Sequence, residues 1–218
     1  MAKKISAIKY DMLKKYPPQL ARVAGHLQEA LLKRPAYLAD TRFTTRPASV
    51  LFPLCWHDSQ VQVLFTKRTS KLSNHGGQIS FPGGGQDKTD SGPAYAALRE
   101  TYEEIGVKCE QMEILARLDQ TTTITGFCIT PFLGIIEPGS QYVINRHEVE
   151  RLIMVPLVKV LNIRNYQEEE IIWEDNPTYW IALKHGNDVI WGATARILLS
   201  FIGALKDVGV DYKIAVDI

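Results

Sequence analysis

The stretch that decides the fold is Phe81-Pro-Gly-Gly-Gly-Gln-Asp-Lys-Thr-Asp-Ser-Gly-Pro-Ala-Tyr-Ala-Ala-Leu-Arg-Glu-Thr-Tyr-Glu-Glu-Ile-Gly-Val107. It begins as a glycine-rich turn and continues as a helix. Asp90 or Ser91 is suited to cap the helix N-terminus, and Pro93 is suited to its first turn. Gly106 is suited to the left-handed residue that follows a helix. These signals predict a helix over Pro93–Ile105.

Three glutamates, Glu100, Glu103 and Glu104, share one face of this helix because their spacing is i, i+3 and i+4. Like charges at this spacing destabilise a helix by roughly 0.2–0.5 kcal/mol per pair, and the helix dipole disfavours anions in the last turn. Arg99 offsets only part of the repulsion, by pairing with Glu103. The pattern therefore indicates a bound cation, and carboxylate oxygens suit Mg²⁺ or Mn²⁺. The alternative is a solvated acidic face, which is what such a pattern usually means when it stands alone.

The run from Gly84 to Val107 resembles the Nudix box, in which a glycine and a spaced acid precede Arg-Glu-x-x-Glu-Glu-x-Gly and an apolar residue. The residues that match in register are Arg99, Glu100, Glu103, Glu104, Gly106 and Val107. The usual position of the spaced acid falls on Ser91, and Asp90 lies beside it.

The resemblance implies a metal-dependent hydrolase of a diphosphate bond. It implies that Glu100 and Glu104 are the main metal ligands, with Glu103 and the Gly84 carbonyl completing the cluster. It also implies catalytic roles for Arg99, Glu103 and Glu104. A glutamate from a later loop, Glu148 or Glu150, would act as a base or an additional ligand, and we take Glu148 as the candidate. A surface charge is the alternative for both.

The segment from Leu64 to Asp87 is similar to the extra motif of the coenzyme A diphosphatase subfamily of Nudix proteins. That subfamily also has a lengthened loop before the helix, which agrees with the displaced Asp90. Cations and glycines in this segment favour a phosphate-rich ligand. We expect the substrate to be bound by Lys67, Arg68, His75 and Gly84. The alternatives are a surface charge for Arg68 and a structural imidazole for His75.

The expected reaction converts coenzyme A or a derivative to 4′-phosphopantetheine and adenosine 3′,5′-bisphosphate. The same chemistry on ADP-ribose or NADH is the alternative. An isopentenyl-diphosphate isomerase is disfavoured because no cysteine here matches that enzyme's catalytic cysteine. A non-catalytic diphosphate-binding module is disfavoured because such modules commonly lose the box carboxylates, which this chain keeps.

The resemblance covers about Ala48 to Leu205 and implies an α+β fold, the Nudix α/β/α sandwich around a mixed sheet. Apolar spacing predicts further helices at Ala193–Leu205, around Val155–Leu161, and within about Asp11–Lys33 as a surface appendage. Short β-rich runs predict strands at Ala48–Leu54, Val61–Thr66, Gln78–Phe81, Met112–Leu118, Ile129–Ile136 and Tyr179–Leu183. We therefore divide the chain into an N-terminal helical extension, residues 1–45, and a Nudix domain, residues 46–218.

Composition narrows the class of partner. The chain has 218 residues and a formal net charge of +1, and it lacks a long basic run, so we expect a small diphosphate-containing substrate and no nucleic acid. No apolar stretch reaches the length of a signal peptide or membrane span, and Cys55, Cys109 and Cys128 lack metal-ligand spacing. We therefore expect free buried thiols, no membrane association and a cytoplasmic location. A homodimer is an open alternative to a monomer.

Overall fold

The computed structural model describes residues 13–39, 46–70, 76–173 and 176–210. Its larger sheet is mixed and has eight strands, which are β1 (Arg46–His57), β2 (Gln60–Arg68), β3 (Ile79–Ser80), β4 (Gly83–Gly85), β5 (Met112–Arg117), β6 (Thr121–Thr122), β7 (Phe127–Ile136) and β8 (Val149–Pro156). A smaller antiparallel sheet contains β9 (Tyr166–Trp173), β10 (Asn176–His185) and β11 (Asp188–Ile190). The helices are α2 (Pro18–Leu32), α3 (Pro93–Ile105), α4 (Leu157–Leu161) and α5 (Gly192–Asp207), with short 3-10 turns at Cys109–Gln111 and Ile163–Asn165.

The centre of the larger sheet is the parallel pair β1 and β7, whereas the other pairings are antiparallel. Two parallel neighbours need a long crossover, and α3 lies in the connection between them. Residues along β1 alternate between two apolar clusters, with Phe52 and Leu54 in one and Leu51 and Cys55 in the other. The sheet is therefore buried on both faces.

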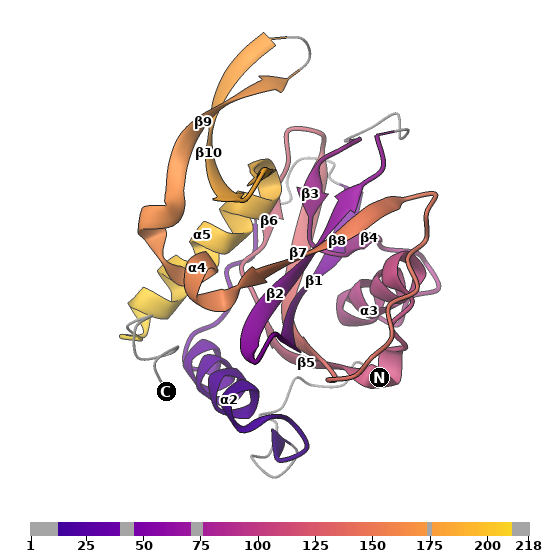
Figure 1. The fold of residues 1–218 in the computed structure, drawn as a ribbon, viewed down its shortest axis with the longest axis vertical. Coiled ribbons are helices and arrows are strands. Elements are labelled where there is room, and N and C mark those ends of the chain that lie inside the picture. Colours follow the sequence, from indigo (N-terminus) through magenta and orange to yellow (C-terminus); the bar gives the residue numbers. More distant parts are fainter. Residues whose placement is uncertain (1–12, 40–45, 71–75, 174–175, 211–218) are drawn as a thin grey trace.

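Helices cover both faces of this sheet (Figure 1). The box helix α3 packs against β1, β4 and β7 on one face, in the smaller apolar cluster. Residues of α2, α4 and α5 share the larger cluster on the other face. The predicted mixed sheet between helical layers is confirmed.

The N-terminal helix is part of the core, so the prediction of a surface appendage is wrong. Leu20, Val23 and Leu27 of α2 are buried in the larger apolar cluster. Polar contacts add to this packing, because the Tyr16 hydroxyl donates to Glu113 (2.9 Å) and Gln28 Nε2 donates to the Leu115 carbonyl (2.9 Å). The apolar stripe of the helix covers sheet surface that would otherwise be exposed to water. The division of the chain at residue 45 stays a prediction.

Asp119, in the connection between β5 and β6, binds the segment that follows α2. Its carboxylate accepts two hydrogen bonds from Arg34, one from the Tyr37 amide (2.7 Å) and one from the Ser200 hydroxyl (3.1 Å). Burial alone would raise the pKa of Asp119, but these hydrogen bonds outweigh it and hold the pKa below its usual range. Asp119 therefore fastens the N-terminal segment, the sheet and α5 together.

Two local predictions need correction. The helix predicted around Val155–Leu161 begins only at Leu157, because Val155 and Pro156 still pair with β2 as the last residues of β8. Of the smaller sheet, only the middle of β10 was predicted, since β9 and β11 carry few of the apolar alternations that mark a strand.

The cysteine prediction holds in part. All three cysteines are free; Cys55 and Cys128 are buried, whereas Cys109 is partly exposed. Among the residues that the structure describes, no helix is long and apolar enough to cross a membrane.

Candidate functional site

The ends of α3 lie where the sequence predicts them, but the N-terminal cap differs. The cap residue is Gly92, with φ 155°, and Pro93 follows as the first helical residue. Neither Asp90 nor Ser91 caps the helix, because Asp90 is engaged by Arg99 instead. At the other end Gly106 has φ 74°, and its amide donates to the Tyr102 carbonyl (2.8 Å). The helix therefore ends in the predicted left-handed glycine.

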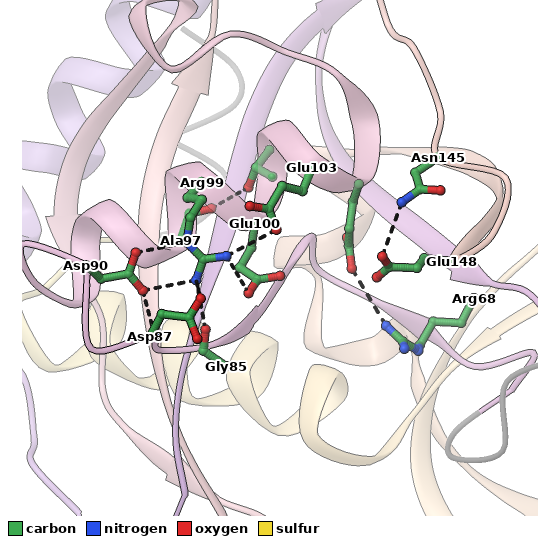
Figure 2. A network of polar contacts seen from close by, with 12 residues as sticks. Arg68, Gly85, Asp87, Asp90, Ala97, Arg99, Glu100, Glu103, Asn145 and Glu148 are labelled. Carbon is green, nitrogen blue, oxygen red and sulfur yellow. Dashed lines mark hydrogen bonds and ion pairs between the residues drawn. The ribbon is translucent and has the colours of Figure 1, made fainter.

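Arg99 clasps the loop before α3 onto the helix (Figure 2). Its Nε donates to Asp90 Oδ1 (2.8 Å), and its Nη2 donates to Asp90 Oδ2 (3.0 Å) and to the Gly85 carbonyl (3.0 Å). The Asp90 side chain is only 3% exposed. The hydrogen bonds from Arg99 are the main reason that the pKa of Asp90 lies below its usual range. The displaced acid of the box thus holds Arg99, which in turn holds the glycine turn.

The same guanidinium bridges two of the box glutamates. Arg99 Nη1 donates to Glu100 (2.9 Å) and to Glu103 (3.1 Å), so the predicted Arg99–Glu103 pair is present. Burial is the largest reason that the pKa of Glu100 is raised, although Arg99 opposes it. A Cβ atom at Gly84 would lie 2.4 Å from a Glu100 carboxylate oxygen. Only glycine can bring its backbone this close to that carboxylate.

Glu104 faces Arg68 and is the most buried box carboxylate, with 2% of its side chain exposed. Its Oε1 lies 3.6 Å from Arg68 Nη1, whereas its Oε2 is buried without a hydrogen-bond partner. Burial raises the pKa of Glu104 to about 8, against the attraction of Arg68. A buried carboxylate oxygen without a partner is costly unless a cation or donor meets it.

The oxygen atoms of these box residues are suitable ligands for a divalent cation. The partnerless oxygen of Glu104, the close approach of Gly84 to Glu100 and the all-oxygen donor set suit Mg²⁺ or Mn²⁺. In the described part of the chain, however, no three acidic, His or Cys side chains are gathered tightly enough to enclose an ion. Arg99 holds Glu100 and Glu103, while Arg68 faces Glu104. The predicted ligand cluster therefore requires these side chains to move, and it stays a prediction.

Glu148 lies beside the box carboxylates, whereas Glu150 does not join them. Glu148 accepts a hydrogen bond from Asn145 (3.2 Å), and its charge contributes to the raised pKa values of both Glu100 and Glu104. Figure 2 shows it near Arg68. Glu150 instead pairs with Lys67 (3.2 Å). Of the two predicted alternatives, only Glu148 faces the candidate site.

Some of the predicted substrate-binding residues line a common cavity, and others do not. Arg68 and Gly84 both line a cavity of ≈ 710 Å³. Lys67 is occupied by Glu150, and its phosphate-binding role stays a prediction. His75 lies outside the described residues.

Several other residues of this cavity were not predicted as site residues. Besides Arg68 and Gly84, its lining includes Arg46, Phe127, Trp180 and Arg196. They come from β1, β7, β10 and α5. No local sequence signal marks them, because each belongs to an otherwise ordinary strand or helix.

Comparisons with known proteins agree with the box and the fold. Residues 45–175 match the model of the NUDIX domain. A protein of Enterobacter sp. (strain 638), named "Uncharacterized Nudix hydrolase NudL", is 36% identical over 168 residues, covering 77% of this chain and 86% of that protein. A protein of the same name from Klebsiella pneumoniae (strain 342) is 35% identical over 154 residues, covering 70% and 79%.

Solved structures with a similar arrangement include a MutT/nudix family protein from Enterococcus faecalis, with 16% identity and a TM-score of 0.48 over 93% of this chain and 76% of that chain. A C. elegans Ap4A hydrolase has 19% identity and a TM-score of 0.44, covering 50% and 80%.

Proposed function

The chain belongs to the Nudix hydrolase family, and on that premise we propose that it hydrolyses the diphosphate bond of coenzyme A or a derivative. The products would be 4′-phosphopantetheine and adenosine 3′,5′-bisphosphate. The observation that carries this proposal is the approach of Arg68 to Glu104 (3.6 Å) beside the cavity. Arg68 belongs to the segment that resembles the coenzyme A subfamily, and Glu104 belongs to the Nudix box. The two motifs therefore meet at one place.

Nudix hydrolases use divalent metal ions. We propose that Glu100 and Glu104 hold Mg²⁺ or Mn²⁺, with Glu103 and the Gly84 carbonyl completing the set. The ion would neutralise the diphosphate, polarise phosphorus and lower the pKa of a bound water. The partnerless Oε2 of Glu104 supports the assignment, because a buried anionic oxygen is stabilised by a nearby positive charge.

The other site residues would position the diphosphate. Arg68 would attract a phosphate oxygen, and Gly84 would let the substrate approach the backbone closely. Arg99 would keep the glycine turn against α3 through its bonds to Asp90 and the Gly85 carbonyl. In this assignment Arg99 acts by positioning its neighbours.

Glu148 is the candidate base, since its carboxylate lies near the box glutamates and comes from the turn just before β8. It would accept a proton from the attacking water while phosphorus receives the oxygen and the other phosphoryl group leaves. Glu103, with half of its side chain exposed, would contribute mainly charge. The work of the protein is thus positioning and charge stabilisation.

The test is chromatographic product analysis after incubation with coenzyme A, ADP-ribose and NADH, each with Mg²⁺, with Mn²⁺ and with a chelator. Release of adenosine 3′,5′-bisphosphate, dependent on metal and faster than cleavage of the other two substrates, is the expected result. Cleavage confined to ADP-ribose or NADH would remove coenzyme A and keep the diphosphatase chemistry. The homodimer and the cytoplasmic location stay predictions, which sedimentation and cell fractionation would test.

A further inference from the structure

The cavity has a second group of cations away from the box. Arg46 Nη2 donates to the Thr125 carbonyl (3.1 Å), and Arg196 Nη2 donates to the Thr122 carbonyl. Arg196 is thus anchored to the end of β6, and Arg46 is anchored to the turn between β6 and β7. In the described part of the chain, no ion pair joins either of them to an acidic side chain. Their positive charges are therefore not neutralised by those residues.

Arg46 also lies over an aromatic ring. Its guanidinium carbon lies 4.1 Å from the centroid of Phe127, because the parallel pairing of β1 with β7 sets these two residues side by side. A cation–π contact of this kind orients a guanidinium and reduces the side-chain entropy that is lost when it binds a ligand.

The first turn of α5 lines the same cavity through Gly192, Ala193 and Thr194. The first amides of a helix have no partner within the helix, and no side chain caps α5. The partial positive charge at the start of α5 therefore adds to the positive charge of the arginines and attracts an anion into the cavity. The lining includes three arginines and no acidic residue, so the cavity is suited to an anion.

These cations are separate from the diphosphate end of the cavity. Ser49 of β1 pairs with Gly84, and Arg46 precedes Ser49 by three residues. A strand rise of ~3.3 Å per residue places the Arg46 backbone ~10 Å from the Gly84 level. The two ends of the cavity are therefore separate enough to contact different phosphate groups of one substrate.

We propose that Arg46, Arg196 and the first turn of α5 bind a second phosphate of the substrate, which is not part of the diphosphate that is cut. This inference rests on the proposed function and assigns its specificity, since nucleotides with an additional phosphate on the ribose are preferred over those without it. Bidentate arginine–phosphate contacts supply the recognition.

The experiment compares kcat/KM for coenzyme A and for 3′-dephospho-coenzyme A. Each of Arg46→Gln and Arg196→Gln should reduce the preference for coenzyme A by roughly tenfold or more, the usual effect of a lost charge-assisted hydrogen bond. Activity on 3′-dephospho-coenzyme A should be unchanged. Arg196→Lys should restore part of the preference because it keeps the charge. The matched control is Arg164→Gln, at an exposed arginine remote from the cavity.

Binding calorimetry with adenosine 3′,5′-bisphosphate and adenosine 5′-monophosphate separates this inference from the proposed function. Tighter binding of the bisphosphate, abolished in both glutamine variants, supports the second phosphate site even if coenzyme A is not hydrolysed. Equal binding of the two nucleotides by the unaltered protein would overturn it, whether or not coenzyme A is cleaved. An equal loss of activity on both substrates in the glutamine variants would also overturn it, because that result indicates a structural role.

Discussion

Replacing Asp90 with asparagine should destabilise the protein by about 2–3 kcal/mol, because it breaks the charge-assisted pair with Arg99. The Asp90 carboxylate accepts bonds from Arg99 Nε (2.8 Å) and Nη2 (3.0 Å) and from the Asp87 amide (2.7 Å). An asparagine amide keeps one acceptor but sets its NH₂ group against a guanidinium donor. Arg99 retains Glu100 and Glu103, so the effect should stay below that of an uncompensated buried charge, about 3–5 kcal/mol.

The measurement is urea denaturation together with thermal unfolding, where about 2–3 kcal/mol corresponds to a Tm decrease of roughly 4–12 °C for a chain of this size. The matched control is Asp87→Asn. Asp87 is also an aspartate of the loop near Arg99, but its side chain is 71% exposed and 3.9 Å from Nη2, and its loss should cost less than about 0.5 kcal/mol. Equal destabilisation by the two variants would refute the idea that Arg99 clasps the loop through Asp90.

Three further outcomes are expected. Glu104→Gln should remove most diphosphatase activity while thermal unfolding stays near normal, whereas Glu110→Gln, at an exposed glutamate, should leave both unchanged; retained activity in the first variant contradicts the ligand assignment. The pKa of Asp119 is depressed in the folded protein, so this residue should contribute stability that is fully present above its unfolded pKa of ~3.9 and lost as the pH falls below that value. Urea midpoints measured at descending pH should show this loss of stability. Asp119→Asn should make the loss smaller. Gly106→Ala should destabilise the protein by roughly 1–3 kcal/mol, because φ is +74° and the new Cβ would lie 2.7 Å from Val143. Gly139→Ala, with φ +83° but open space around it, should destabilise the protein less. Equal destabilisation of the two variants in urea would show that the contact with Val143 does not contribute.

Local sequence signals account for the parts of the fold that were predicted well. The bounds of α3 follow from Pro93 and Gly106, which act within one helical turn. The prediction failed where distant partners decided the result. Asp90 does not cap α3 because it binds Arg99, and Val155 belongs to β8 because it pairs with β2. The amphipathic pattern of the N-terminal helix shows that one face is apolar, but it does not show which part of the molecule that face covers, and only the tertiary structure places it on the sheet.

The sequence by itself determined the chemistry of this protein, because the glycine turn and the spacing of Glu100, Glu103 and Glu104 act through neighbours along the chain. Only the tertiary structure decided which charges meet. The approach of Arg68 to Glu104 depends on β2 ending beside α3, and the placement of Arg46 against Phe127 depends on the parallel register of β1 and β7. Arg196 reaches the same cavity from a helix 150 residues further along the chain than Arg46. Coulombic and hydrogen-bonding energies fall off over a few ångströms of space, so such pairs exist only once the sheet has brought the segments together.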